Sequence, residues 1–298
     1  MKKISKPRLL KRTKKTKIKT NKIPFLWKNL SLTKDDIIVF WRPMLLVIFV
    51  YASAYAITVI GLNFVIPQLT NQTTTGVLAS EQNPDTITKI SDSLSVAVSF
   101  VSGDQASSLV QFILFLVASL AFIWTLRQIR KLDNITVSQA YYQGTSQFVP
   151  AFLLCIWFLI FLIPISIGTT ILSAGIAFAV TAVDNILVYG SFFSLSFLSL
   201  WLYAKYWPSF YIITLPRIKP VYALKQAGLL TKKHRLNISL QVVGFSLLSI
   251  IIFVPLILMV ALALPKVTPY WLFSLLFIYF GLAHVFMFNI YRGLVDAN

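Results

Sequence analysis

The chain has 298 residues, of which 57% are hydrophobic and 12% are charged, and its mean hydropathy is +0.77. The net charge is +18, from 27 Lys and Arg against 9 Asp and Glu. Because a soluble domain usually carries about 25% charged residues, this composition excludes an ordinary soluble domain and indicates a chain that lies mostly in lipid. One cysteine and two histidines exclude an intramolecular disulfide and a Cys/His zinc site, and we expect neither a metal nor a cofactor.

Residues 1–24 form a basic tail that contains no acidic and no aromatic residue. Dense like charge and two prolines predict disorder. The tail could hold the first span in its orientation, bind anionic lipid head groups at about 1 kcal/mol per basic residue, or bind nucleic acid. Since no recognition motif supports nucleic acid, we expect membrane lipids as partners. The residues expected to contact anionic head groups are Lys2, Lys3, Lys6, Arg8, Lys11, Arg12, Lys14, Lys15, Lys17, Lys19 and Lys22.

Residues 25–43 differ from the tail because aromatic and aliphatic side chains are mixed among the charges. Thr33 followed by Asp36 resembles a capping box, which predicts a short interfacial helix from about residue 33. Trp27 and Trp41 are suited to the level of the lipid head groups. We therefore expect an interfacial segment ahead of the first span.

A transmembrane helix requires about 20 consecutive apolar residues, and six stretches of the chain satisfy this requirement. The predicted spans are residues 44–66, 107–126, 150–172, 188–213, 238–264 and 269–291. Only residues 265–268 separate the last two, which predicts a tight turn between antiparallel helices. The first of these stretches is too long for the apolar region of a cleaved signal peptide, so it is expected to remain as a span.

These elements predict an all-α fold, a polytopic membrane helix bundle with short cytoplasmic amphipathic helices. The membrane domain would cover residues 44–292, and residues 293–298 would form a cytoplasmic C-terminus. Pro164, Pro208 and Pro255 lie within predicted spans, and each is expected to kink its helix because it removes one backbone donor.

The orientation follows from the distribution of basic residues between the loops. If the N-terminus is cytoplasmic, the exoplasmic segments are residues 67–106, 173–187 and 265–268, and Lys89 and Lys266 are their only basic residues. The cytoplasmic segments carry 24 basic residues. Because positive residues resist translocation, we expect a multi-pass protein of the cytoplasmic membrane with both termini in the cytoplasm.

An internal parallel repeat is also predicted. Residues 125–130 at the end of the second span share Thr, Leu and Ile with residues 214–219 at the end of the fourth. A candidate short cytoplasmic helix follows each of them, at residues 136–147 and 220–231, and another span follows each short helix. The alternative is that any two membrane exits share basic residues and short polar loops.

The second of these short helices carries a family resemblance. Residues 220–227, with the sequence PVYALKQA, and residues 230–232, with the sequence LTK, resemble a segment in a loose set of bacterial six-span membrane domains. One of these is the membrane domain attached to some glycerophosphodiester phosphodiesterases, and the similarity covers roughly residues 107–292. In that family the hydrolytic chemistry belongs to a separate soluble domain. The resemblance therefore implies the six-span architecture and no catalytic residue.

The sequence contains no recognisable catalytic constellation. None of the nine acidic residues lies in the middle of a predicted span, and the glycines form no phosphate-binding loop or nucleophile elbow. We therefore expect a protein that is not an enzyme, an accessory or scaffold component of the membrane that contacts other membrane proteins. The alternative is a transporter or permease for a small solute or lipid, and an intramembrane enzyme is a third possibility.

Lys205, His284 and Asn289 are the candidate site residues. At 1.5 Å per residue, Lys205 and His284 lie roughly 12–14 Å inside the cytoplasmic boundary, where a lysine that faces lipid costs a few kcal/mol. One interpretation is that the lysine reaches the interface along its stem and that a neutral histidine bonds to a carbonyl or to Asn289. The other is that these side chains face one water-filled cavity beside Pro208, open to the cytoplasm.

Overall fold

The computed structural model describes residues 26–65, 105–129, 136–178, 181–264 and 267–297, and within these residues all regular structure is helical. Six helices are long and apolar enough to cross a membrane, so the predicted all-α fold is confirmed. The long helices are α1 (Leu26–Val65), α3 (Gln105–Gln128), α5 (Phe148–Phe178), α6 (Ala182–Tyr206), α9 (Arg235–Ala263) and α10 (Thr268–Ala297). The short helices are α4 (Val137–Gly144), the 3-10 turn η1 (Thr145–Gln147), α7 (Ser209–Ile213) and α8 (Pro220–Leu230).

Helix α1 begins earlier than the sequence predicts. Two helices meet in α1 at a kink at Phe40, and the first of them begins at Leu26 rather than at about residue 33. Thr33 lies inside the helix, where its hydroxyl donates to the carbonyl of Asn29 at 2.8 Å, so the predicted cap is wrong. The boundary between the two parts remains visible, since Phe40 has non-helical torsions (φ −119°, ψ 23°) and Pro43 follows.

The fourth span is interrupted rather than kinked. Helix α6 ends at Tyr206, a turn over Trp207 and Pro208 follows, and α7 begins at Ser209. A proline cannot donate a backbone hydrogen bond and its ring clashes with the preceding turn. The Ser209 hydroxyl donates to the carbonyl of Tyr206 at 2.6 Å and satisfies part of the broken ladder.

The order of long helix, short helix and long helix occurs twice, as the internal repeat predicts, in α3–α4–α5 and in α6–α7–α8–α9. Both principal short helices bury small residues four positions apart, Ala140 and Gly144 in α4, and Ala223 and Ala227 in α8. Small side chains allow two helix backbones to approach closely. These small residues therefore allow close packing of α4 on the long helix α3 and of α8 on the short helix α7.

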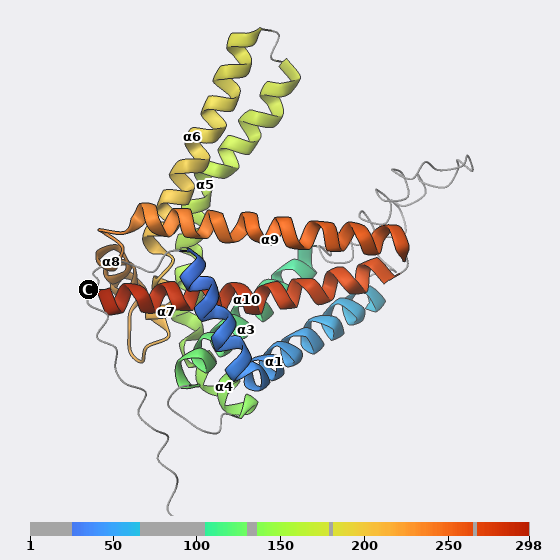
Figure 1. Cartoon of the computed structure of the whole chain (residues 1–298), viewed down its shortest axis with the longest axis vertical. Helices are drawn as coiled ribbons and strands as arrows, with labels where there is room; N and C mark the ends of the chain where they lie inside the picture. Colours follow the sequence, from blue (N-terminus) through green and yellow to red (C-terminus); the bar gives the residue numbers. More distant parts are fainter. Residues whose placement is uncertain (1–25, 66–104, 130–135, 179–180, 265–266, 298) are drawn as a thin grey trace, which may run out of the picture.

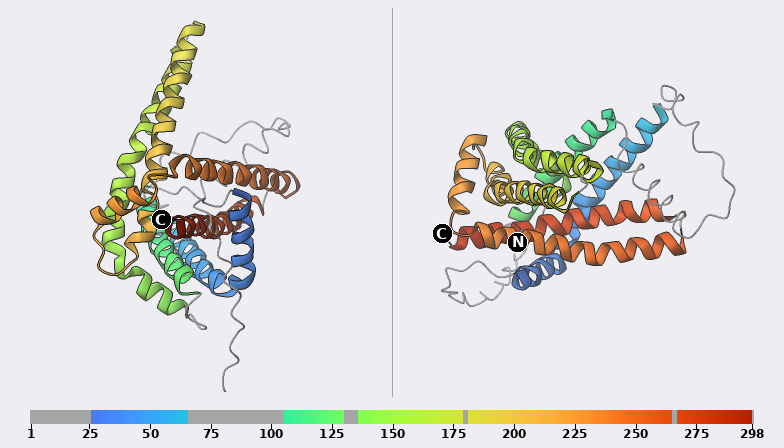
Figure 2. Two further views of the ribbon diagram at one scale, coloured as in Figure 1. Left: turned by 60° about the vertical axis from the view of Figure 1, so that its left-hand side comes forward. Right: turned by 90° about the horizontal axis from the view of Figure 1, so that it is seen from above.

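The long helices form two groups (Figures 1 and 2). Helices α1, α3 and α10 pack around a core that contains Val47, Phe122 and Phe286, and α9 lies along α10, where the rings of Phe245 and Phe286 stack with centroids 4.3 Å apart. Helices α5 and α6 form a hairpin that projects away from these four helices and runs across their direction. The hairpin meets the other helices near its base, where α7 and α8 lie.

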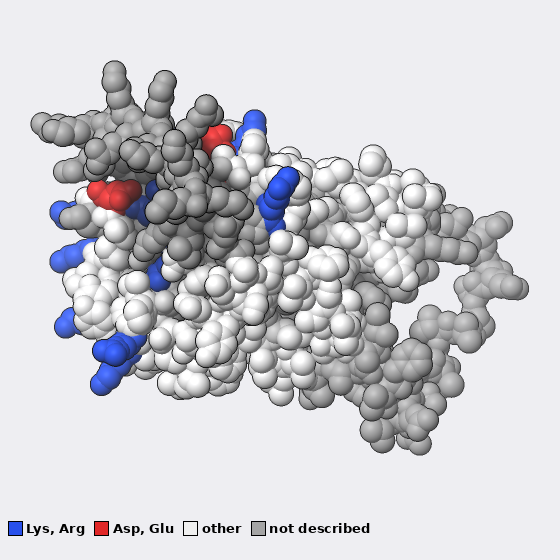
Figure 3. All heavy atoms as spheres, turned by 90° about the horizontal axis from the view of Figure 1, so that it is seen from below, with Lys and Arg blue, Asp and Glu red and all other residues white. Residues whose placement is uncertain are grey.

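The described basic residues gather at one end of the molecule, the end that carries α8 and the last turns of α10. Figure 3 shows several Lys and Arg, with a few acidic residues, on the visible part of this end, while the described surface toward the opposite end is uncharged. The described basic residues are Lys28, Lys34, Arg42, Arg127, Lys205, Arg217, Lys219, Lys225, Lys232, Lys233, Arg235 and Arg292. Arg127 also has a structural role, because its guanidinium donates to the carbonyl of Tyr211 and joins α3 to α7.

Some predictions concern residues outside the described part of the chain. One is the prediction that residues 1–24 are disordered. The other concerns the loop at residues 67–106, of which only the last two residues are described, at the start of α3. Of the predicted turn at residues 265–268, the backbone N–H of Val267 donates to the carbonyl of Leu264 at 3.0 Å.

Candidate functional site

Lys205 lies on the last turn of α6 and lines a cavity of about 460 Å³ between α5, α6 and α8. Its ammonium lies 4.4 Å from the centroid of the Tyr206 ring, which is a favourable cation–π distance. Its carbonyl accepts a hydrogen bond from the Thr231 hydroxyl at 3.0 Å, so the end of α8 is tied to the end of α6. The lysine is therefore positioned by contacts with its own helix and with α8.

His284 has different surroundings, in the core between α3 and α10. Its Nε2 lies 3.2 Å from Ser119 Oγ, and its ring lies between Phe122 and Phe280, with centroids 5.7 Å and 4.6 Å away. The histidine carbonyl accepts from the Tyr211 hydroxyl at 3.3 Å. His284 is not among the residues that line the Lys205 cavity, so the structure does not bring these two side chains into one shared cavity.

Asn289 belongs to a third place, a buried polar network that connects the start of α1 to α9 and α10. Its side-chain amide donates to Thr33 Oγ1 at 3.3 Å, and Thr33 in turn donates to the carbonyl of Asn29. The Asn29 amide donates to Gln241 on α9, whose own amide donates to Asn237 at 3.1 Å. These bonds explain how the first part of α1 packs against the basic end of the helices.

Replacing Thr33 with Val should destabilise the protein by about 1 kcal/mol more than replacing Thr58 with Val. Both threonines donate to the carbonyl four residues before them at 2.8 Å, so both substitutions remove that local bond. Only Thr33 also accepts from Asn289, whose buried amide would lose its partner. Thermal unfolding in detergent would measure the difference, and equal effects of the two substitutions would contradict the network.

One wall of the Lys205 cavity is formed by a single face of α8. Its α8 wall consists of Val221, Leu224, Lys225, Gly228 and Leu229, whose spacing of three and four residues places them on one face of the helix. Pro220 at the first position pre-organises this helix. The opposite side of α8, which carries the buried small residues, packs on α7. One short helix therefore uses one face for packing and the other for the cavity.

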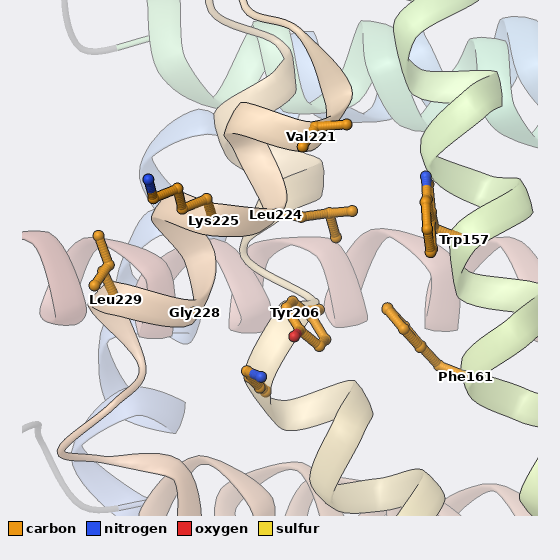
Figure 4. Close-up of a pocket in the computed structure, with 9 residues that line it drawn as sticks. Trp157, Phe161, Tyr206, Val221, Leu224, Lys225, Gly228 and Leu229 are labelled. Carbon is orange, nitrogen blue, oxygen red and sulfur yellow. The ribbon is translucent and has the colours of Figure 1, made fainter.

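The walls opposite α8 are aromatic. Trp157 and Phe161 come from α5, and the Phe161 ring stacks on Tyr206 with centroids 4.8 Å apart. Figure 4 shows Leu224 pointing toward Trp157 across the cavity, while Lys225 extends away from Trp157. The cavity thus combines an apolar, aromatic side with a side that carries lysines. Apart from Lys205, these lining residues were not predicted as a site, although the stripe on α8 is visible in their spacing.

A second cavity, of about 500 Å³, lies between α1 and α10. Its lining includes Met44 and Ile48 from α1 and Phe277 and Leu282 from α10, and it contains no charged side chain. It has no ionisable group to orient a polar ligand. Among the described residues, no group of three or more His, Cys, Asp and Glu is placed to hold a metal ion.

Six long apolar helices define the class of this molecule, a multi-pass α-helical membrane protein. Comparison with models of protein families, with curated proteins and with solved structures finds no match for the chain. The resemblance of residues 220–232 to a family of six-span membrane domains therefore stays a hypothesis.

Proposed function

We propose that the chain acts without a catalytic site, as an accessory or scaffold component of the cytoplasmic membrane that holds another membrane protein. The hairpin of α5 and α6 is the observation that supports this proposal. Its outward side chains are large and apolar, with Ile186 71% and Phe193 67% exposed, and it projects from the other long helices. A projecting apolar hairpin offers its faces laterally, where a neighbouring membrane protein can pack against them.

A polar cavity shared by Lys205 and His284 would have supported the transporter alternative. Their surroundings are separate, as described above, so these two residues do not support a solute path. An intramembrane serine hydrolase would need a histidine that faces a serine, and His284 Nε2 does lie 3.2 Å from Ser119 Oγ. Its ring is enclosed between Phe122 and Phe280, and neither His284 nor Ser119 lines either of the two cavities described above, so this pair has no place for a substrate beside it.

We further propose that the basic end faces the cytoplasm, so that both termini are cytoplasmic and residues 67–106 are exoplasmic. The 24 basic residues of the expected cytoplasmic segments against two in the exoplasmic segments support this orientation. The gathering of the described Lys and Arg at one end supports it as well. Anionic head groups of the cytoplasmic leaflet would then lie beside this end.

Cysteine labelling in a Cys155→Ala background would check the orientation. A cysteine at Ser80 should react with a membrane-impermeant reagent in intact cells, whereas a cysteine at Lys233 should react only after the cells are opened. Lys233 is exposed and follows α8, whereas the nearby Thr231 is fully buried and would be a poor reporter. Labelling of position 233 in intact cells would refute the orientation.

Affinity purification in mild detergent would test the scaffold role. Replacing Ile186 and Phe193 with Ala should reduce the recovery of a co-purifying membrane protein, because a packed interface loses its largest side chains. The matched control replaces Leu240 and Ile251, which are exposed on α9 to similar extents (70% and 67%). Equal recovery with both pairs would contradict a partner on the hairpin.

A further inference from the structure

We propose that the cavity between α5, α6 and α8 binds the phosphate-bearing head group of an anionic glycerophospholipid from the leaflet beside the basic end. This proposal concerns a different surface from the outward face of the hairpin, and it does not depend on the scaffold role. It rests on the cations that line the cavity, on the apolar wall opposite them and on the way α8 is held.

The two lysines that line the cavity come from two helices, Lys205 from α6 and Lys225 from α8. A Cβ at position 228 would lie 3.6 Å from Lys205 Cε, so the stem of this lysine runs against α8 beside Gly228. Lys225 lies three residues before Gly228 on the same face. The lining residues include both lysines and no acidic residue, so an anion there meets positive charge without an opposing carboxylate. Lys225 lies at the edge of the cavity, because its side chain extends away from Trp157. Ammonium groups are good donors to phosphate oxygens.

The wall opposite the lysines distinguishes a lipid from a soluble anion. Trp157 and Phe161 present their rings on the α5 side, and Leu224 points toward Trp157. Trp and Tyr are characteristic of the level of the lipid head groups, where one end of the ring is apolar and the other is wet. A soluble phosphate would gain no binding free energy from this apolar wall, whereas the glycerol and first methylenes of a lipid would bury apolar surface there. The volume of about 460 Å³ is within the usual range for ligand sites, about 300–1,000 Å³.

The cavity is fixed in shape by the structure around it. The small residues Ala223 and Ala227 are completely buried, and the Thr231 hydroxyl donates to the Lys205 carbonyl. Helix α8 therefore cannot close onto α5 without losing these contacts. A cavity held open beside the head groups, with cations on one side and rings on the other, suits a single lipid molecule.

Lipid retention by the full chain would test this proposal. The protein would be reconstituted in mixed vesicles of phosphatidylglycerol and phosphatidylcholine, extracted with detergent and washed at high salt, and the retained lipids would be quantified by mass spectrometry. Replacing Lys205 and Lys225 with Met should lower the retained ratio of phosphatidylglycerol to phosphatidylcholine by about fivefold or more, since each basic residue near a membrane contributes about 1 kcal/mol. Arg at both positions should preserve most of the ratio, because it keeps the charge.

The matched control replaces Lys232 and Lys233 with Met, which removes the same charge from exposed positions that do not line the cavity. This control should keep the wild-type ratio. Thermal unfolding would establish that the variants are folded, and the Arg variant provides a second measurement if the Met variant is not. An unchanged ratio with Met at positions 205 and 225, or an equal loss in the control, would overturn the proposal. Displacement of the retained lipid by added inorganic phosphate would also overturn it, in favour of a soluble phosphate ligand.

Discussion

Replacing Ser199 with Ala should lower the free energy of unfolding by about 1–3 kcal/mol, because it leaves a backbone donor and a backbone acceptor unsatisfied inside the hairpin. Ser199 lies on α6, and its hydroxyl accepts from the N–H of Ile165 at 3.0 Å and donates to the carbonyl of Phe161 at 3.1 Å. These two backbone groups lie four residues apart on α5, so in a regular helix they would bond to each other. The serine hydroxyl of one helix is therefore inserted into the hydrogen-bond ladder of the other.

Pro164 is the reason for the insertion. A proline inside a helix clashes with the preceding turn and opens the ladder beside it, and lipid offers no water to satisfy the opened groups. The structure uses a neighbouring hydroxyl instead, which agrees with the common role of Ser and Thr beside prolines in membrane helices. Ser199 is 4% exposed, so no solvent molecule replaces it easily.

A double-mutant cycle would separate this role from simple packing. In a Pro164→Ala background the two backbone groups can bond directly, so Ser199→Ala should cost much less than in the wild type. Ser194→Ala serves as the control, because Ser194 lies on the same helix and is exposed. Thermal or denaturant unfolding in detergent would provide the free energies. An equal cost of Ser199→Ala in both backgrounds would show that the bridge is not responsible.

Gly144→Ala should destabilise the protein by about 1–3 kcal/mol through overpacking. A Cβ at this position would lie 2.7 Å from Ala121 Cα and 2.8 Å from Ala121 N, and 3.0 Å from the carbonyl carbon of Leu120. These are backbone atoms of α3, which cannot rotate away as a flexible side chain would. The substitution has to push α4 off α3, and unfolding in detergent would measure the cost.

Gly190→Ala is the control, and its expected effect on stability has the opposite sign. No atom lies within 4 Å of a Cβ at position 190, and this glycine is also inside a helix. Alanine there should be neutral or stabilising by up to about 1 kcal/mol, since glycine is the poorer helix former. If the two substitutions had the same effect, the close approach of α4 to α3 would not be what determines the cost at Gly144.

The six spans could be predicted because lipid imposes a simple requirement, an apolar run of sufficient length. The short helices at residues 136–147 and 220–231 could be predicted from the repeated pattern, and α4 with η1 and α8 lie there. The extension of α1 to Leu26 was missed because its cause is remote. Its polar residues bond to Gln241 and Asn289, and nothing in a single sequence pairs positions more than 200 residues apart.

The separate positions of Lys205 and His284 could not be predicted from the sequence either. Similar depth suggested that Lys205 and His284 share a cavity, but depth does not specify the direction of a side chain around its helix. His284 is directed toward Ser119, a serine within an apolar span where no sequence pattern marks it. The cavity beside Lys205 is different, because the stripe on α8 from Val221 to Leu229 follows helical spacing and could have been found.

The hairpin of α5 and α6 is attached to the other helices near its base, so its far end is held by few contacts within the protein. Helix α5 has 31 residues, which corresponds to a length of about 46 Å, and its contacts outside the hairpin are with α3, η1, α7 and α8. The Ser199 bridge and the stacking of Phe161 on Tyr206 hold the two helices of the hairpin together. A small rotation at the base becomes a large displacement at the tip. A flat bilayer requires apolar helices to cross a layer about 30 Å thick. The surrounding membrane, together with any protein bound along the hairpin, therefore sets the angle between the hairpin and the other long helices.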